Sequence, residues 1–539
     1  MEVGAREHRG SASPRAGLQG TDRTLYHLPT AAREKRHMDE PIDAASPYDY
    51  VVVGGGTAGA VIARRLAEDP SVTVCLIEAG PSDEGEERVS VLQRWPEMLQ
   101  SEYDWDYPTE PQPRANSEIR ASRARILGGC SSHNVCLAYR APDVDLRRWV
   151  ELGSDGWGPQ DCAPFYDMVF ERTGLEWAPQ IGRTVRDFIA AAASLGFEPF
   201  SAMAEGGRAG VGPSSLNARW PLRRSSAIAY LHPLAELPPN FDLLLETRAR
   251  RLLVEGRQVV GVETDRGHVR AEREVVVSAG VFGSPKLLQL SGIGPAAHLQ
   301  EVGIEVVADL PVGEHLVDHP EGAIAWRTVR PIDQPETSWC DAVLLGSAPG
   351  SAAADPEIML WFFSGAFQEF TVDAGGPPVV ETTLTLSPDV TRPRSAGWVR
   401  LLSDDPADPP RIFYGHFNDA EGYDVRTMVE AYRLARRIAA TAPLSDWLDE
   451  EIAPGADITA DADLEAYARA STYTAHHAAG TCRMGAPDDG RSVVDPELRV
   501  IGMSGLRVAD ASVFPEMIGV NPAITTMMIG ERCASFLTG

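Results

Sequence analysis

The stretch YDYVVVGGGTAGAVIARRLAEDPSVTVCLIE, residues 48–78, decides the fold class. Its first six residues form an apolar run that is typical of a buried parallel strand. Residues 57–69 place Val61, Ile62 and Leu66 at helical spacing, and residues 72–77 read as a second buried strand. A strand, a helix and a strand in this order predict an α/β protein that opens with a Rossmann-like unit.

Three glycines follow the first strand in the spacing G-x-G-x-x-G. Gly54 allows a tight turn, Gly56 lets the backbone approach a pyrophosphate, and Gly59 lets helix and strand pack closely. The helix N-terminus offers free N–H groups to phosphates, and Glu78 ends the second strand where an acid can bind a ribose hydroxyl. The motif predicts a bound dinucleotide without distinguishing FAD from NAD, and three glycines alone could equally form a structural turn.

The length and the charge of the chain limit what it can do. Its 539 residues exceed one ordinary core, so we expect two closely packed domains. The formal net charge of -28 disfavours binding to nucleic acid and to anionic membranes. No apolar run reaches the roughly 20 residues that cross a bilayer. The first residues have no apolar core followed by a small-residue cleavage site, so we expect no secretory signal. We therefore expect a cytoplasmic protein without a membrane span, with residues 1–46 as a disordered tail and Met38 as an alternative start.

Seven cysteines are scattered along the chain, and no two have the spacing of a zinc or iron–sulfur site. This pattern favours reduced thiols and predicts no metal centre. Further strands are predicted at residues 241–245, 251–254, 259–264 and 274–278. A helix is predicted at residues 425–440, where Met428, Val429, Tyr432 and Leu434 are apolar.

Three long motifs resemble those of the glucose–methanol–choline (GMC) oxidoreductases. RARILGGCSSHN (residues 123–134) is similar to the first signature of that family, and GVFGSPKLLQLSGIG (280–294) is similar to the second. The end, LRVADASVFPEMIGVNPAITTMMIGERCA (506–534), resembles the flavin-binding stretch of the same family. The likeness begins near Tyr48, and segments such as YDWDYP and VGEHLVDHPEG are most similar to choline-oxidising members.

The resemblance implies a mixed α/β fold with an FAD-binding domain and a substrate domain built on an antiparallel sheet. The FAD-binding domain would comprise residues 47–200, 235–320 and 480–539. The substrate domain would comprise residues 201–234 and 321–479. The resemblance also allows a homodimer.

The resemblance further implies which residues hold FAD. They are Gly54, Gly56, Thr57, Ala58, Gly59, Glu78, Trp105, Gly129, Cys130, Ser131, His133, Asn134, Ala249, Asp510, Ala511, Pro522 and Thr525. His133 matches a histidine that is covalently joined to the flavin in choline-oxidising members; alternatively it only packs against a non-covalent flavin. The helix that starts near Pro522 would direct N–H groups at the flavin.

Two residues would carry the chemistry. His477 lies in HHAAGTCRMG, where the family has its active-site histidine, and would remove the hydroxyl proton while hydride passes to flavin N5. Asn521 in VNPAIT would hydrogen-bond the substrate oxygen. Without the resemblance, a core histidine and an Asn-Pro turn would be the simpler interpretations.

Some of the predicted substrate-binding residues match those of the choline-oxidising members, and others differ from them. Glu321 and Trp95 match residues that bind a cationic head group through charge and aromatic faces. Four positions differ from the family pattern: Val135, Trp361, Ala475 and His476. These departures make choline doubtful and favour another alcohol, such as an amino alcohol.

The sequence therefore predicts oxidation of a primary alcohol, with oxygen or another electron acceptor. Three alternatives remain: an enzyme acting on choline itself, a flavin-dependent lyase or decarboxylase, and a non-catalytic flavin-binding protein. The last would be expected to lack the base or the glycine motif, and both are present.

Overall fold

The computed structural model describes residues 47–116, 119–179, 181–204, 207–332, 339–348, 355–365 and 382–538. The predicted tail at residues 1–46 lies outside the described residues. All seven cysteines are described, and each is free of a disulfide bond. None of the helices in the described ranges is both long and apolar enough to cross a membrane.

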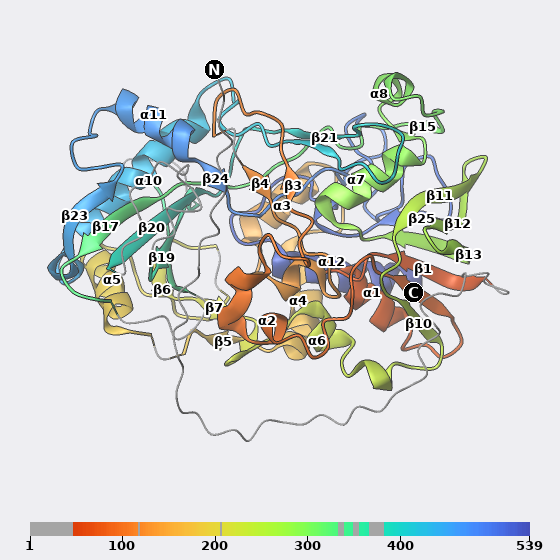
Figure 1. Ribbon diagram of the computed structural model, residues 1–539, viewed down its shortest axis with the longest axis horizontal. Helices are drawn as coiled ribbons and strands as arrows, with labels where there is room; N and C mark the ends of the chain where they lie inside the picture. The colour runs from red at the N-terminus through yellow and green to blue at the C-terminus, as the bar shows by residue number, and fades with distance from the viewer. Residues whose placement is uncertain are drawn as a thin grey trace, which may run out of the picture. The chain divides into compact units, whose positions relative to one another are not determined.

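A seven-stranded sheet contains the N-terminal strand–helix–strand unit (Figure 1). Its order is β10 (Phe241–Leu244), β2 (Val74–Ile77), β1 (Tyr48–Val53), β13 (Gly267–Val277), β12 (Gln258–Thr264) and β11 (Ala249–Glu255), and β25 (Leu506–Val508) also pairs with β13. The pairs of β1 with β2 and β13 are parallel, whereas β11, β12 and β13 form an antiparallel meander. The central β1 is apolar because both of its faces are covered.

The elements predicted for this part are confirmed, with small changes at their ends. β1 has the predicted bounds, while the helix is shorter than expected and runs as α1 (Gly59–Leu66). Helix α12 (Ala523–Thr538) lies against α1, and α4 (Pro159–Thr173) lies against α12. The C-terminal helix therefore packs beside the helix that follows the glycine motif, although 456 residues lie between them in sequence.

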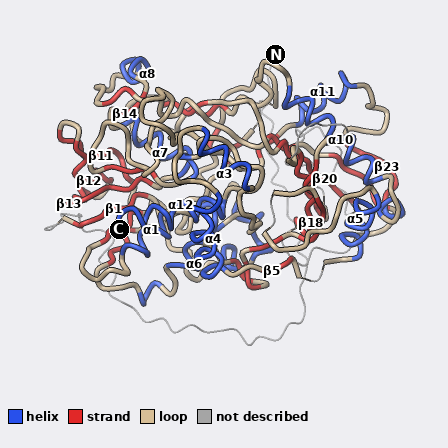
Figure 2. Tube along the Cα trace, turned by 180° about the vertical axis from the view of Figure 1, so that it is seen from behind, coloured by secondary structure: helices blue, strands red, loops and turns tan. Residues whose placement is uncertain are grey.

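A second sheet has eight strands, and its pairings are antiparallel. Its order is β23 (Leu448–Ala453), β17 (Ile324–Thr328), β20 (Thr383–Val390), β19 (Ile358–Phe363), β18 (Cys340–Gly346) and β6 (Gly210–Pro213), and β16 (Pro320–Glu321) pairs with β20 and β24 (Tyr473–Thr474). Figures 1 and 2 show this sheet on the opposite side from the first.

The two faces of the second sheet have different neighbours. Leu360, Leu384 and Leu386 pack against α10 (Tyr423–Ala439), the predicted helix, and α5 (Arg183–Ser194). Alternate residues point the other way, because side chains along a strand alternate between faces. That second face carries Trp361, which belongs to the same apolar cluster as the core of the first sheet.

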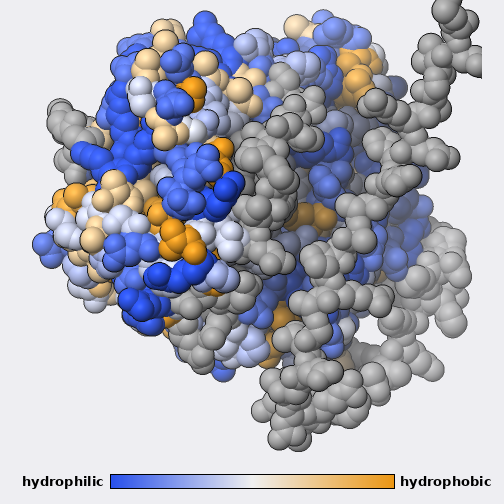
Figure 3. Space-filling view, turned by 60° about the vertical axis from the view of Figure 1, so that its left-hand side comes forward, coloured by the Kyte–Doolittle hydropathy of each residue, from blue (hydrophilic) through white to orange (hydrophobic). Residues whose placement is uncertain are grey.

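The remaining elements are short strands and helices, of which α7 (Gly280–Leu290) is largely buried. They are α2 (Glu87–Ser90), η1 (Leu92–Met98), β3 (Tyr107–Pro108), β4 (Arg120–Ala121), η2 (Gly129–Ser132), α3 (Asp143–Glu151), β5 (Glu176–Trp177), β7 (Ser215–Leu216), β8 (Ala218–Arg219), β9 (Leu222–Arg223), α6 (Ser226–Tyr230), η3 (Leu234–Glu236), α7 (Gly280–Leu290), β14 (Ile293–Gly294), α8 (Ala296–Glu301), β15 (Ala308–Asp309), β21 (Trp398–Arg400), β22 (Arg411–Phe413), α11 (Asp461–Ser471), η4 (Leu444–Trp447) and η5 (Ala511–Val513). Figure 3 shows mostly hydrophilic side chains where the described surface is visible, in keeping with the net charge of -28.

Candidate active site

The glycine loop, residues 54–59, is shaped by contacts that exclude side chains. Gly54 has φ +100°, and a Cβ placed on it would lie 2.4 Å from the carbonyl oxygen of Ser278. A Cβ on Gly59 would lie 1.8 Å from the carbonyl oxygen of Gly54. Both distances are far below contact, so these positions require glycine, as the motif predicted.

The GGCSSHN motif lies directly against the glycine loop. A Cβ on Gly129 would come within 2.7 Å of Gly56 Cα, and the Gly128 N–H donates to the Gly55 carbonyl at 2.7 Å. Ser226 Oγ donates to the Gly56 carbonyl at 3.1 Å and so adds a third segment. The structure thus joins two motifs that were recognised separately in the sequence.

Glu78 lies at the end of β2 beside the glycine loop, where it was expected. Its two carboxyl oxygens accept the backbone N–H groups of Gly55 at 2.8 Å and Gly80 at 2.7 Å. Burial raises the pKa of Glu78 to about 7, against the opposing effect of these hydrogen bonds. A contact with a ribose stays a prediction.

A buried arginine, which the sequence analysis missed, organises the GGCSSHN segment. Arg223 is fully buried and donates to the Val89 carbonyl at 2.9 Å, the Ser131 carbonyl at 3.2 Å and Asn134 Oδ1 at 2.8 Å. The side chain of Asn134 is therefore engaged by the protein. No motif marks Arg223, because it is one of many arginines in a chain with few lysines.

His133 follows η2 and is buried. Its Nδ1 atom has no hydrogen-bond partner among the described residues. Burial, together with the nearby charges of Arg123 and Arg223, lowers the pKa of His133 to about 3. The imidazole is therefore neutral at physiological pH and keeps a nitrogen lone pair.

Strand pairing brings the two histidine-containing segments DHPEG and HHAAG together. Glu321 pairs with Tyr473, and further back along the chain Val317 pairs with Ala479. Between these points the N–H of Ala475 donates to the His319 carbonyl at 3.2 Å, and the N–H of His477 donates to Asp318 Oδ1 at 3.0 Å. These contacts bring the imidazole rings of His319 and His477 together, with their centroids 5.0 Å apart.

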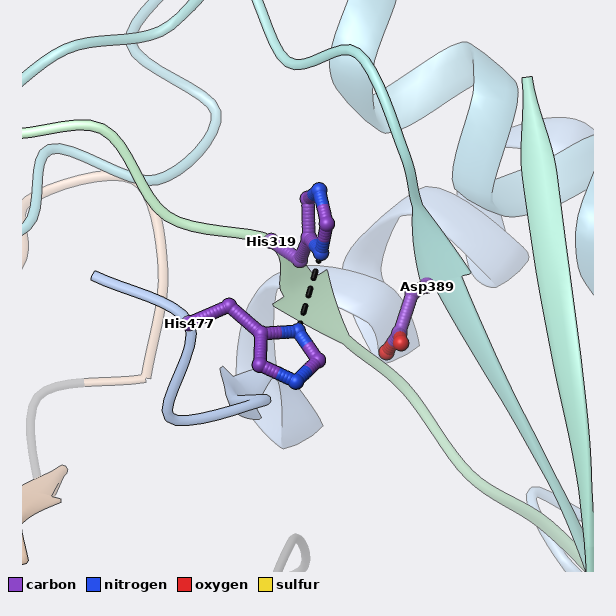
Figure 4. Close-up of side chains that lie close together, drawn as sticks. All are labelled: His319, Asp389 and His477. Carbon is purple, nitrogen blue, oxygen red and sulfur yellow. Dashed lines mark hydrogen bonds between the residues drawn. The ribbon is translucent and has the colours of Figure 1, made fainter. Parts of the chain in front are cut away.

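A chain of hydrogen bonds assigns the proton positions on both imidazoles (Figure 4). His319 Nε2 lies 2.9 Å from the Ile518 carbonyl oxygen, which only accepts, so Nε2 carries the proton. His319 Nδ1 is then the acceptor toward His477 Nδ1, 2.9 Å away. His477 Nε2 in turn has a lone pair and accepts from Asn521 Nδ2 at 3.0 Å.

This assignment requires both imidazoles to be neutral, and burial ensures that they are. Burial lowers the pKa of His319 to about 4. Burial and the neighbouring His319, His476 and Arg123 hold the pKa of His477 well below its usual value. The Nε2 atom of the predicted catalytic base therefore stays unprotonated at working pH, and its lone pair accepts from Asn521.

His476, beside the base, has an unusual backbone conformation. Its φ is +62°, which few residues with a side chain adopt. Its Nδ1 atom is buried without a partner in the described part of the chain, and its pKa is lowered to about 3 by burial, Arg123 and His133. The electrostatic influence of His133 on His476 indicates that the GGCSSHN and HHAAG segments approach each other.

Asn521 is held by the turn before α12. Asp145 Oδ2 accepts the N–H of Gly519 at 2.7 Å, and α12 begins at Ala523, near the predicted start. Asn521 Nδ2 reaches His477, whereas Asn521 Oδ1 is buried and unpaired within the described residues. The two predicted catalytic residues are thus in direct contact.

Glu321 and Asp389 form a carboxyl cluster next to these residues. They are paired across β16 and β20, and both are buried. Ser387 Oγ donates to Glu321 at 2.8 Å, and Trp361 Nε1 donates to Asp389 at 2.9 Å. Asp389 was not predicted as a site residue, although residues 383–390, TLTLSPDV, alternate between polar and apolar and so place the polar side chains on one face.

His319, Asp389 and His477 also offer donor atoms that all lie within 4.8 Å of one another (Figure 4). Their nitrogens are engaged in the hydrogen bonds described above, Nδ1 against Nδ1. We interpret the group as a hydrogen-bonded network that adjoins the carboxyl cluster.

The remaining predicted residues lie around these features. Among the predicted cofactor residues, Thr57 and Ala58 precede α1, Cys130 and Ser131 lie on η2, and Ala249 begins β11. Asp510 and Ala511 follow β25, Pro522 and Thr525 lie at the start of α12, and the Trp105 ring stacks on Tyr107 with centroids 5.8 Å apart. On the predicted substrate side, Trp95 lies on η1 and Val135 follows η2. Two side chains are engaged by protein, since Asp510 accepts the Gly280 N–H at 2.9 Å and Thr525 bonds Tyr166 at 2.8 Å. Their roles stay predictions.

The residues present fit FAD. Three buried polar atoms lack partners in the described ranges: His133 Nδ1 at a predicted flavin position, His476 Nδ1 at a predicted substrate position and Oδ1 of the predicted catalytic Asn521. Buried polar atoms are normally hydrogen-bonded, so these three indicate a missing polar ligand. The glycine loop supplies the close backbone approach that the nucleotide half needs.

Comparison with known protein families agrees with this site. Residues 48–321 match the N-terminal part, and residues 393–530 the C-terminal part, of the family described as GMC oxidoreductase. The chain is 42% identical to choline oxidase of Arthrobacter globiformis, covering 91% of this chain and 94% of that one. It is 35% identical to the oxygen-dependent choline dehydrogenase of Sinorhizobium medicae, covering 91% and 95%.

Solved structures give the same picture. Pyridoxine 4-oxidase from Mesorbium loti superposes with a TM-score of 0.84 at 30% identity, covering 90% of this chain and 98% of that one. A variant of Aspergillus oryzae formate oxidase, solved to study modification of its FAD, superposes with a TM-score of 0.82 at 26% identity, covering 92% and 98%.

Proposed function

Because the chain belongs to the GMC oxidoreductase family and is an FAD-dependent alcohol oxidoreductase, we propose that it oxidises a small primary alcohol to the aldehyde or further, with amino alcohols as the favoured class. The observation that carries the proposal is the lone pair on His477 Nε2. It is set by the chain of hydrogen bonds from Ile518 through His319 and lies next to Asn521. Glu321 supports a cationic group on the substrate.

The residues of this chain would bind and deprotonate the alcohol. The hydroxyl would replace Asn521 Nδ2 as the donor to His477 Nε2, which takes the proton as the carbon becomes oxidised. Asn521 would donate its amide N–H to the substrate oxygen and stabilise the charge that develops there. His319 would keep His477 in the productive tautomer. FAD, when bound, supplies the acceptor for the hydride.

FAD would be held by the residues that were predicted from the sequence. The glycine loop and the start of α1 would bind the pyrophosphate, and the N-terminus of α12 would face the flavin. We also propose that His133 would be joined covalently to the flavin, because the neutral, buried imidazole has an unpaired Nδ1 and retains a nucleophilic lone pair. The new bond would replace one C–H bond of the flavin; two protons would be released, and the two electrons would pass through the flavin to the electron acceptor of the enzyme. After acid precipitation, flavin absorbance should stay in the protein pellet, and His133→Ala should release it. Flavin wholly in the supernatant of the unmutated protein would refute the bond.

The deciding experiment is an anaerobic panel of alcohols, including amino alcohols, neutral alcohols and choline. Bleaching of the flavin spectrum by an alcohol, with the aldehyde as product, is the expected result. Loss of substrate without bleaching would support a lyase or decarboxylase reaction, and no reaction with any alcohol would reject the proposal. Readmitting air to the bleached enzyme then tests oxygen as the acceptor, since rapid return of the yellow colour requires it.

A further inference from the structure

Two buried carboxyl groups face each other beside the proposed base. Glu321 and Asp389 are directly opposite on neighbouring antiparallel strands, an arrangement that places Cβ atoms about 5 Å apart on one face. Glu321 is 5% exposed and Asp389 is 0% exposed. Like charges in these positions repel each other strongly because little water is present to screen them.

Neither carboxyl group is neutralised by the protein within the described ranges. Each accepts hydrogen bonds only from uncharged groups, Glu321 from Ser387 and Asp389 from Trp361. Asp389 Oδ1 is buried and has no partner among the described residues. Burial raises the pKa of both groups. A site of this kind is costly unless a ligand supplies positive charge and hydrogen-bond donors.

Asp389 is also close to the reacting end of the site. One of its oxygens lies within 4.8 Å of a nitrogen of His477 and of a nitrogen of His319. Figure 4 shows its side chain pointing toward His477. A cationic group bound to Asp389 and a hydroxyl bound to His477 could therefore belong to one small molecule, joined by a short carbon chain.

Building on the proposed function, we infer that the substrate is a short amino alcohol whose ammonium carries N–H groups and bridges Glu321 and Asp389. Such an ammonium donates to the unpaired Oδ1 of Asp389 and brings the charge that the pair lacks. A quaternary ammonium has no N–H group, so it would leave that oxygen buried and unpaired. Sites built to hydrogen-bond one group reject the analogue that lacks it, which makes Asp389 a specificity-determining residue.

The test measures binding without turnover. Ethylammonium and tetramethylammonium, which have no hydroxyl to oxidise, are titrated into the flavin-loaded enzyme, and dissociation constants are taken from calorimetry and from flavin difference spectra. Ethylammonium should bind about tenfold or more tightly than tetramethylammonium, the ratio expected when a charged hydrogen bond is lost. Asp389→Asn should weaken ethylammonium binding by about tenfold and change tetramethylammonium binding much less.

A matched control separates this effect from a general loss of charge. Asp449 is exposed on β23 of the same sheet, so Asp449→Asn removes the same charge outside the site and should leave both constants unchanged. Retained flavin absorbance and circular dichroism verify that Asp389→Asn is folded. The wild-type ranking of the two cations needs no variant and tests the inference even if Asp389→Asn does not fold.

The outcomes distinguish this inference from the proposed function. Equal affinity for both cations, or an equal loss of both in Asp389→Asn, would overturn the inference. Bleaching by neutral alcohols with no binding of either amine would also overturn it while leaving alcohol oxidation intact. Binding of the amines in the predicted order with no bleaching by any alcohol would instead reject the proposed function and leave the ammonium site standing.

Discussion

The glycine loop and the carboxyl cluster serve one flavoenzyme but are built in opposite ways. The glycine loop uses backbone atoms and comes from one short segment. Neighbouring backbone atoms lie so close to Gly54 and Gly59 that neither position has room for a side chain. The carboxyl cluster uses side chains from β16 and β20, which are separated by more than 60 residues. Backbone geometry of this kind accepts few substitutions, whereas side chains in the cluster can be exchanged without altering the strands.

The two regions also differ in how their polar atoms are paired. Around the glycine loop, both carboxyl oxygens of Glu78 accept backbone N–H groups. In the carboxyl cluster Asp389 Oδ1 is unpaired in the described residues, and nearby Asn521 Oδ1 is unpaired too. The difference teaches that Glu78, beside the glycine loop, is satisfied by the protein alone, while the carboxyl cluster depends on its ligand for hydrogen bonds and charge.

The largest effect is expected where the backbone is most confined. Gly54→Ala should abolish flavin binding and lower the thermal midpoint, because its Cβ would lie 2.4 Å from the Ser278 carbonyl oxygen and the backbone must shift. Gly85→Ala is the control, since Gly85 also has positive φ (+86°) but nothing within 4 Å of an added Cβ. A yellow, stable Gly54→Ala protein would contradict this account of the loop.

Next in size is removal of the proposed base. His477→Ala should retain flavin and lose about 10²- to 10⁴-fold in the rate of flavin reduction by an alcohol, the usual contribution of a positioned general base. Stopped-flow reduction under anaerobic conditions measures it. His268→Ala, which changes an exposed histidine on β13, should reduce flavin at the wild-type rate. Unchanged reduction in His477→Ala would remove the residue from the mechanism.

A smaller effect is expected from the carboxyl cluster. Glu321→Gln should raise KM for an amino alcohol by about 10- to 100-fold, because a charged hydrogen bond is lost, and should affect neutral alcohols little. Burial raises the pKa of Glu321, so in the wild-type enzyme KM for an amino alcohol should rise as the pH falls through that raised value and the carboxylate becomes protonated. Steady-state kinetics across pH measure both effects. Equal changes for charged and neutral alcohols would argue against the assignment.

The smallest effect concerns stability. The pKa of His319 is lowered from 6.5 to about 4, so between these values the unfolded chain takes up a proton that the folded chain does not. Stability should therefore fall as the pH is lowered through this window, by about 1.4 kcal/mol per pH unit for this histidine. Urea unfolding at several pH values should give a shallower dependence for His319→Gln and an unchanged one for His268→Ala. Identical slopes in all three proteins would contradict the neutral assignment of His319.

Much of the cofactor side could be predicted from the sequence. Strand β1, helix α1 and the position of Glu78 follow from a continuous apolar run, helical spacing and three glycines, all of which are local patterns. His477 and Asn521 were found through motifs of a known family, and the structure brings them within 3.0 Å of each other. The contacts of Arg223 and His319 were not predictable, because their partners lie on segments far away in the sequence.

The sequence by itself therefore determined the strand, the glycine loop and the helix of the nucleotide-binding unit. The patterns that predict them lie within about thirty residues, because glycine and periodic apolar residues act locally. Only the tertiary structure decided which imidazole nitrogen of His477 keeps its lone pair, since that depends on the carbonyl of Ile518 acting through His319. It also decided that Asp389 lies opposite Glu321, because strand register is set by long-range pairing that no local pattern encodes. Substrate choice rests on those long-range contacts, so it became visible only in the folded chain.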